Sequence, residues 1–170
     1  MPDTPDPAPA TLQRLSRLVF DSIPRAVISL LLVTAVIINF ANVIGRYVFD
    51  HAIYWTEEIL VFLLLWTVFI GMVSVTYNGA HLSMDLMSRR LSGWPKRMLR
   101  GVVALSLIAC SAVVVVQSAK VVLVLAGTGQ VSVAASVPMV VPHASILVGF
   151  ALVGLATIVR FRAYLTDRFE

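Results

Sequence analysis

Four long stretches of this chain contain no Asp, Glu, Lys or Arg, and they constrain its fold more than any other feature. They cover residues 26–44, 59–77, 101–119 and 137–159. A helix rises about 1.5 Å per residue, so even the shortest stretch reaches roughly 28 Å, close to the thickness of the hydrocarbon core of a bilayer. The sequence therefore predicts an all-α integral membrane protein with four transmembrane helices. This fold excludes most classes of soluble enzyme.

The composition supports a single membrane domain. Hydrophobic residues make up 59% of the 170 residues and charged residues 13%, whereas about a quarter of a soluble domain is charged. We expect a tail at 1–25, a four-helix membrane domain at 26–160 and a second tail at 161–170. The net charge of +4 comes from basic residues that flank the apolar stretches. It therefore indicates membrane topology and not nucleic-acid binding.

The N-terminal segment is polar and rich in proline. The first apolar stretch is too long for the core of a cleavable signal peptide, so we expect a retained signal-anchor helix. Residues 1–10 have the composition of disordered chain. Residues 11–22 are expected to form a short amphipathic helix on the membrane surface.

The basic residues are distributed unevenly between the two sides of the membrane. Eleven of the 13 lie before the first stretch, between the second and third, or after the fourth. Only Arg46 and Lys120 belong to the opposite side. Because Lys and Arg collect in cytoplasmic loops, this distribution predicts that both termini are cytoplasmic.

The connecting segments also carry patterns. Apolar residues recur on one face of 82–91, before Gly93 and Pro95, which predicts a short interfacial helix between spans two and three, followed by a turn. Residues 125–137 are rich in Gly, Ser, Thr and Ala and predict an outer loop. We expect the fourth helix to begin near Pro138, with an irregular first turn at Pro142.

Charged residues lie at the facing ends of the first two predicted helices. Arg46 lies near the end of the first helix, and Glu57 and Glu58 lie at the entry to the second. Pairing lowers the cost of placing charges beside hydrocarbon. We therefore favour a structural ion pair between Arg46 and either glutamate over a transport site. No nucleophile or metal-ligand set accompanies the glutamates in the sequence, so we expect no catalytic, cofactor-binding or metal-binding residues.

The same region carries a broader pattern. NVIGRYVF at 42–49 is followed by WTEE at 55–58, then by Trp66, Phe69 and Gly71, and then by GAH at 79–81. The combination resembles the DctQ-like small membrane subunit of TRAP transporters (tripartite ATP-independent periplasmic transporters), with a looser match at 137–149. The resemblance implies structural or partner-contact roles for eight residues: Asn42, Arg46, Trp55, Glu57, Glu58, Trp66, His81 and Asp85.

The family resemblance implies a scaffold and not an enzyme. In such a system a large multispanning subunit carries the sodium and substrate sites and moves as an elevator, while the small subunit supports it in the bacterial inner membrane. A periplasmic solute-binding protein delivers the solute, here expected to be small and carboxylate-bearing, and the sodium gradient drives symport. The implied partners are those two proteins and the lipid bilayer, with no nucleic acid and no cofactor.

Polar residues inside the apolar stretches are few, and they include Thr34, Asn39, Asn42, Thr67, Ser74 and Gln117. A carrier or pore needs a connected polar path through the bilayer, so we expect these residues to make interhelical hydrogen bonds instead. Cys110 lies in the third stretch and is expected to be a small packing residue.

The histidines bear on a different class of function. A haem held by two histidines needs them at matched depth, whereas His81 and His143 are predicted at opposite sides of the membrane and His51 in a loop. His81 and Asp85 either anchor the inner loop or form a solvated pair. The alternative function is a small membrane-anchor subunit of a redox enzyme that binds quinone or haem. A third is a self-contained homo-oligomeric channel.

Overall fold

The computed structural model describes residues 15–78 and 94–161. The described part contains four helices that are long and apolar enough to cross a membrane. Their bounds are Ile23–Val48 (α2), Thr56–Tyr77 (α3), Trp94–Thr128 (α5) and Val140–Val159 (α6), and these residues form no β-strand. The predicted all-α membrane fold with four spans is confirmed. The predicted interfacial helix at 82–91 lies outside the described residues.

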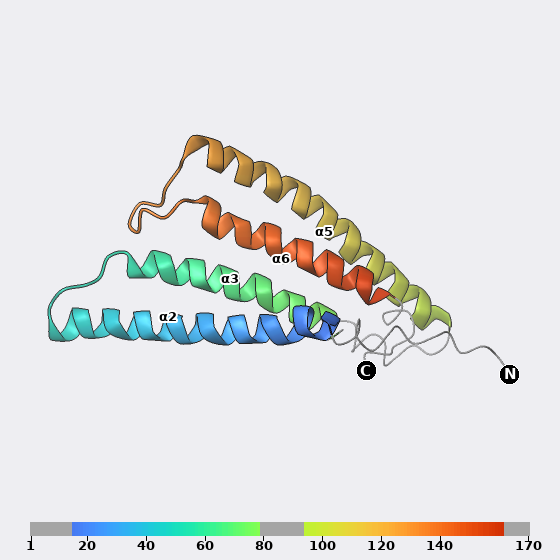
Figure 1. Cartoon of the computed structure of the whole chain (residues 1–170), viewed down its shortest axis with the longest axis horizontal. Helices are drawn as coiled ribbons and strands as arrows, with labels where there is room; N and C mark the ends of the chain where they lie inside the picture. The colour runs from blue at the N-terminus through green and yellow to red at the C-terminus, as the bar shows by residue number, and fades with distance from the viewer. Residues whose placement is uncertain (1–14, 79–93, 162–170) are drawn as a thin grey trace.

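The helices stand in a row in the order α2, α3, α6, α5 (Figure 1). The chain forms two antiparallel hairpins, α2–α3 and α5–α6, and the contact between α3 and α6 joins them. The hairpins diverge toward one end, which we call the loop end because it holds residues 49–55 and 129–139 (Figure 1). They converge at the opposite end, here called the terminal end, where α3 and α6 finish.

The first span begins earlier than the sequence predicts. One continuous helix runs over Leu15–Val48, so the separate surface helix predicted for 11–22 is wrong for residues 15–22. A wider π-helical turn, η1 (Leu18–Ser22), lies within it. Pro24 follows this turn. Because proline has no N–H to donate to the carbonyl four residues earlier, it accounts for the widened turn.

The ends of the second hairpin follow from its sequence. Helix α5 stops at Thr128 because Gly129 adopts φ +62°, a conformation that favours glycine, and donates from its N–H to the Leu125 carbonyl at 3.1 Å. Helix α6 begins at Val140, two residues after Pro138, close to the predicted start. Pro142 lies in its first turn, where the missing N–H costs no helical hydrogen bond.

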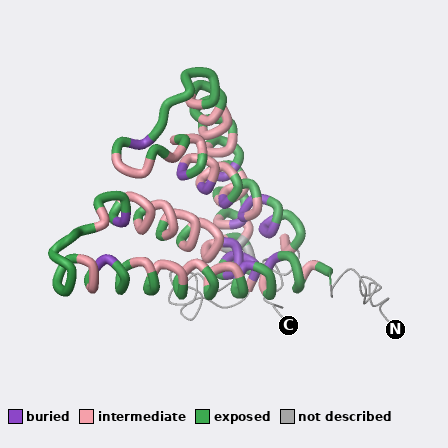
Figure 2. Tube along the Cα trace, turned by 60° about the vertical axis from the view of Figure 1, so that its left-hand side comes forward, coloured by how far each residue is buried: buried purple, intermediate pink, exposed green. Residues whose placement is uncertain are grey.

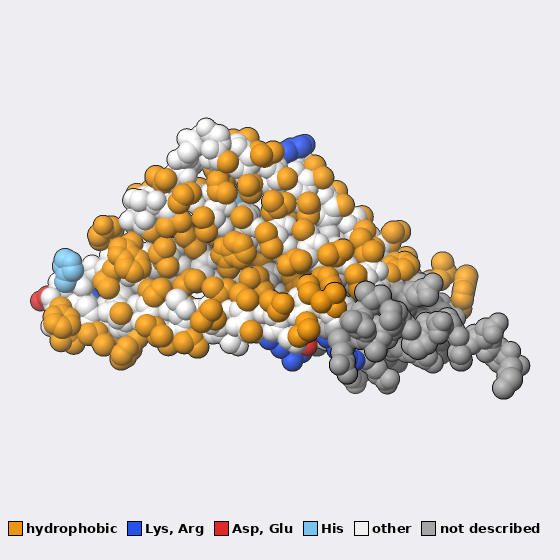
Figure 3. Space-filling view, viewed as in Figure 1, with side chains coloured by type: hydrophobic (Ala, Val, Ile, Leu, Met, Phe, Trp, Pro, Cys, Tyr) orange, Lys and Arg blue, Asp and Glu red, His pale blue; other side chains and the backbone are white. Residues whose placement is uncertain are grey.

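The core is small and lies toward the terminal end (Figure 2). It consists of buried side chains from η1, α3 and α6, namely Phe20, Val73, Tyr77, Val153 and Ala156. Of the 18 most apolar consecutive residues in each span, only 6% to 33% are buried within the chain. Apolar side chains cover most of the visible face (Figure 3), which suits a protein whose solvent is lipid.

Candidate functional site

Glu58 ties the two hairpins together at the loop end. Its carboxylate accepts hydrogen bonds from the backbone N–H groups of Val133 (3.2 Å), Ala134 (3.0 Å) and Ala135 (2.6 Å). Glu58 lies in the first turn of α3, where the helix dipole also favours a negative charge. A single side chain therefore fixes the α5–α6 loop to α3 across the open end of the row.

Asn42 and its neighbours organise the loop between α2 and α3. The buried Asn42 side chain accepts a hydrogen bond from the Ile53 N–H at 3.0 Å through its Oδ1. The His51 N–H donates to the Gly45 carbonyl at 2.9 Å. A Cβ on Gly45 would lie 2.8 Å from the His51 carbonyl oxygen. The absent side chain of Gly45 therefore lets the loop fold back onto α2.

Arg46 is paired with Glu57 and not with Glu58. The closest nitrogen and oxygen of the pair are 3.6 Å apart, and the two side chains are 53% and 80% exposed. An ion pair of this length and exposure contributes about 0–1 kcal/mol. The two adjacent glutamates thus have different roles in the structure: Glu57 faces a cation at the surface, and Glu58 anchors a loop.

The remaining predicted residues are dispersed. Trp55 precedes α3 and is 38% exposed at the loop end, and Trp66 is half-buried within α3. His81 and Asp85 lie outside the described residues. Between the two tryptophans in sequence, Thr56 is fully buried, and its hydroxyl has no hydrogen-bond partner within the described residues.

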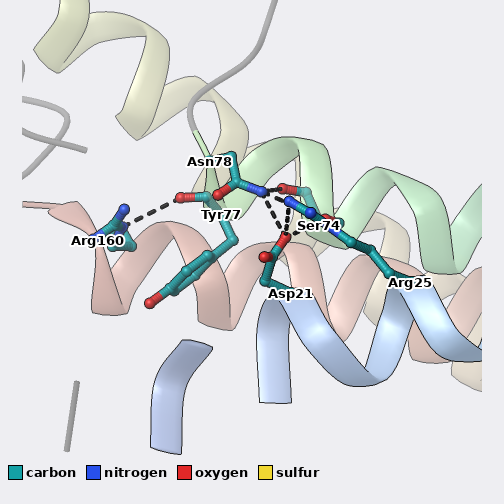
Figure 4. Close-up of polar contacts among 6 residues, drawn as sticks. All are labelled: Asp21, Arg25, Ser74, Tyr77, Asn78 and Arg160. Carbon is teal, nitrogen blue, oxygen red and sulfur yellow. Dashed lines mark hydrogen bonds and ion pairs between the residues drawn. The ribbon is translucent and has the colours of Figure 1, made fainter. Parts of the chain in front are cut away.

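A second polar cluster lies at the terminal end (Figure 4). The interhelical hydrogen bond expected for Ser74 is confirmed there, whereas the sequence analysis made no prediction for Asp21. The Asp21 carboxylate accepts hydrogen bonds from the Ser74 hydroxyl and from the Asn78 amide, each at 2.7 Å. Arg25 pairs with the same carboxylate at 2.8 Å. Asp21 comes from η1 and its donors from the end of α3. This carboxylate therefore joins the start of the first span to the end of the second.

Tyr77 extends this cluster to α6. Its ring stacks on Phe20 with centroids 5.6 Å apart. Arg160 also contacts Tyr77 in two ways. Its guanidinium lies 4.5 Å from the centroid of the Tyr77 ring, and its Nε donates to the Tyr77 carbonyl at 3.2 Å (Figure 4). The Tyr77 hydroxyl shares a hydrogen bond of 3.0 Å with Ser16. Three segments distant in sequence therefore meet at one aromatic residue.

A local signal for this cluster exists in the sequence. Asp21 precedes Arg25 by four residues, and Ser74 precedes Asn78 by four at the end of an apolar stretch. Each spacing places two polar groups on one side of a helix. Pairing between the two helices is a tertiary feature that these spacings alone do not reveal.

The middle of the spans lacks a comparable polar cluster in the described part of the chain. The Thr34 and Thr67 hydroxyls donate to the carbonyls of Leu30 and Leu63 in their own helices, each at 2.8 Å. The interhelical hydrogen bonds predicted for these two threonines are therefore wrong. Where α3 meets α6, a Cβ on Gly149 would lie 2.7 Å from the Phe69 Cβ. The two helices are thus in tight contact at this point, and the buried hydroxyls of Ser145 and Thr157 bond to carbonyls of α6 itself and do not form a polar path through the described helices.

Groups of three or more His, Cys, Asp or Glu side chains that could hold a metal ion do not occur among the described residues. The polar clusters at the two ends are instead built from carboxylate, amide and hydroxyl groups that bond to other parts of the same chain. Their geometry is that of structural connections between elements.

Comparison with known proteins places this architecture in a family. No curated protein matches the sequence. A family model described as the DctQ component of tripartite ATP-independent periplasmic transporters matches residues 35–166, which is most of the chain and includes all four spans in whole or in part. Members of this family are components of a transporter, and the four apolar helices of this chain agree with that description. The chain therefore belongs to the DctQ family of small membrane components of TRAP transporters.

Proposed function

We propose that this chain is the small scaffold subunit of a sodium-coupled, binding-protein-dependent TRAP transporter for a small, carboxylate-bearing solute. The observation that carries the scaffold role is the distribution of polar groups. Hydrogen-bonded clusters tie the helices together at both ends, while between them Gly149 of α6 packs directly on Phe69 of α3. This arrangement suits a rigid body and does not suit a conduit for a polar solute.

The proposed orientation places the protein in a bacterial inner membrane with both termini in the cytoplasm. The basic residues of the sequence support this orientation. The terminal end, with Asp21 and Tyr77, then lies on the cytoplasmic side. The loop end, with Glu58 and residues 129–139, lies on the periplasmic side. Each end cluster is thereby close to a membrane surface, where polar groups cost least.

The scaffold would act mechanically. In an elevator transporter one part moves across the bilayer while another part stays fixed, and the fixed part must resist tilting. Glu58 holds the loop ends of the two hairpins together, and Asp21 and Tyr77 hold the terminal ends. With both ends tied, the four helices form one rigid body that can serve as part of the fixed scaffold beside the large subunit.

The loop end would also contact the periplasmic binding protein. Val133 is 99% exposed, although the N–H groups of residues 133–135 are fixed by Glu58. A rigid loop that presents an apolar side chain needs little ordering on binding, which favours a docking role. The small area of this loop fits a weak, transient contact better than a permanent one.

Reconstitution tests the proposal. The chain, the large subunit and the binding protein are placed in proteoliposomes in all combinations, with and without a sodium gradient, and uptake of labelled carboxylate solutes is measured. We expect uptake only when all three proteins and sodium are present. Uptake by this chain alone would contradict the scaffold role. Full uptake without this chain would show that it is dispensable and would also contradict the role.

A further inference from the structure

The face of α5 that points away from α6 carries polar side chains inside the membrane span. Gln117 and Lys120 are both exposed on the isolated chain. Neither forms a hydrogen bond or ion pair with another residue in the described part of the structure. One of the basic side chains in Figure 3 stands among apolar side chains on the α5 edge of the molecule. A partner for these groups therefore lies outside the described helices.

Gln117 and Lys120 lie deep enough in the span that a polar group without a partner is costly. The α5 span covers Gly101–Thr128. At 1.5 Å per residue, Gln117 lies about 16 Å from the loop end of this span and Lys120 about 12 Å. An amide at that depth is surrounded by hydrocarbon in a lipid-facing helix, and a polar group without a partner there is strongly disfavoured. Charged residues in spans usually face protein or a water-filled cavity.

The two polar residues belong to a regular seam. Exposed residues recur along this side of α5 at alternating spacings of four and three, which is the period of a helix that packs lengthwise on another helix. The first members of the seam are small, so that a neighbouring backbone can approach closely. We call this set the α5 seam, and it consists of Ser106, Cys110, Val113, Gln117, Lys120 and Val124.

The opposite edge of the row has a different character. The exposed face of α2 is formed by large apolar side chains, among them Leu30, Val36 and Phe40, each more than 60% exposed. Asn39 is also exposed there, but it is a neutral amide, and α2 carries no charged side chain between residues 26 and 45. Such a surface suits lipid. The α5 seam mixes two exposed valines, Val113 and Val124, with small residues, an amide and a charge, and this combination suits protein better.

We propose that the α5 seam docks one membrane-spanning helix of the large subunit, which presents a carboxylate or another hydrogen-bond acceptor to Lys120 and Gln117. This inference rests on the proposed function. A phospholipid headgroup is a poor occupant because it lies at the membrane surface, well above Gln117. A second copy related by a two-fold axis is also poor, because the symmetry would bring two Lys120 ammonium groups together at the same depth.

The native cysteine provides the test. Cys110 is the single cysteine of the chain and lies on the seam. Membranes that contain this chain and a tagged large subunit are treated with a photo-crosslinker attached through a maleimide. Two control variants carry the cysteine elsewhere in a Cys110→Ala background: Ala112→Cys on another exposed side of α5, and Val36→Cys on α2. We expect a crosslink to the tagged large subunit from position 110 and from neither control.

Co-purification of the uncrosslinked proteins separates the two ways in which the idea can fail. If the large subunit does not co-purify with the native chain, the proposed function is wrong and the docking proposal falls with it. If the complex purifies but crosslinks arise from position 36 or 112 and not from 110, only the choice of face is wrong. A crosslink from position 110 to a second copy of this chain, or the absence of any crosslink from position 110, contradicts docking of the large subunit at the α5 seam.

A second set of variants tests the polar contact itself. Gln117→Leu combined with Lys120→Leu should lower recovery of the large subunit about fivefold, the effect of losing roughly one interhelical hydrogen bond. The isolated double variant should keep its thermal stability, because neither side chain has a partner within the described residues. Asn39→Leu on α2 is the matched control and should leave recovery unchanged. Equal recovery from the double variant, or an equal loss from Asn39→Leu, contradicts the proposal.

Discussion

Glu58 accepts a hydrogen bond from the backbone N–H of Ala135, 77 positions later in the chain, at 2.6 Å. Two further N–H groups of the same loop point at the same carboxylate. The adjacent Glu57 carboxylate lies 3.6 Å from Arg46 and is mostly exposed. The two neighbouring glutamates therefore have different roles: Glu58 fixes the position of a loop, and Glu57 forms a surface ion pair.

Replacing Glu58 with Gln should loosen the α5–α6 loop. The amide keeps one oxygen acceptor but loses the charge and places an NH₂ donor where N–H groups already converge. Hydrogen exchange of the amides of residues 133–135 should become faster, and the melting temperature of the purified protein should fall. Glu57→Gln is the matched control and should change neither. Unchanged exchange in Glu58→Gln would mean that the loop holds its position without the carboxylate.

The Arg46–Glu57 pair should contribute little to folding. A double-mutant cycle with Arg46→Ala and Glu57→Gln isolates the interaction from the separate effects of each change. Because both side chains are more than half exposed, we expect a coupling energy of about 0–1 kcal/mol. Thermal stability in detergent at low and high salt provides the measurement. A coupling that exceeds this range and resists salt would indicate that the pair becomes buried in the assembled transporter.

The sequence predicted the membrane fold because apolar stretches report directly on a lipid environment. Helix number and the approximate spans follow from that physics. The helix ends are less predictable, since Gly129 and Pro24 act through local backbone geometry that ends or widens a helix without any change in hydrophobicity. The separate surface helix predicted for residues 11–22 was wrong for residues 15–22 because the helix continues through the widened turn.

The candidate site was predictable only in part. The facing charges of Arg46 and Glu57 are visible in the sequence because consecutive helices must meet at a short loop. The partners of Glu58 and Asp21 are distant in sequence and are backbone or small polar groups. Such partners carry no distinctive pattern. They become visible only when the contact between α3 and α6 and the course of the loops are known.

Gly149 should tolerate no side chain. A Cβ there would lie 2.7 Å from the Phe69 Cβ and 3.1 Å from the Phe69 carbonyl oxygen, so that α3 and α6 would have to separate. Gly149→Ala is therefore expected to destabilise the protein by about 1–3 kcal/mol, a typical cost of overpacking. Gly127→Ala is the control, because a Cβ at Gly127 meets nothing within 4 Å. Equal melting temperatures for the two variants would contradict the close α3–α6 contact.

Two buried threonines of α3 should respond in opposite ways to the same change. Thr56 and Thr76 are both fully buried. The Thr76 hydroxyl donates to the Met72 carbonyl at 2.8 Å, whereas the Thr56 hydroxyl lacks a partner in the described part of the chain. Thr56→Val should stabilise the protein because it removes a buried hydroxyl without a hydrogen bond, and Thr76→Val should destabilise it by about 0.5–1.5 kcal/mol. Thermal unfolding in detergent measures both. A loss of stability in Thr56→Val would reveal a partner for that hydroxyl.

The loop end should face the periplasm. The distribution of basic residues motivates this orientation, and the exposed loop residues provide positions to label. In a Cys110→Ala background, cysteines at His51 and Val133 should react with a membrane-impermeant maleimide added to intact spheroplasts, because both side chains are exposed. A cysteine at Trp94, which is exposed at the start of α5, should react only after the membrane is opened. Detergent-treated samples control for reactivity at each position. Labelling at 94 in intact spheroplasts, with protection at 51 and 133, would invert the topology and would place the Glu58-anchored loop in the cytoplasm, where no periplasmic binding protein could reach it.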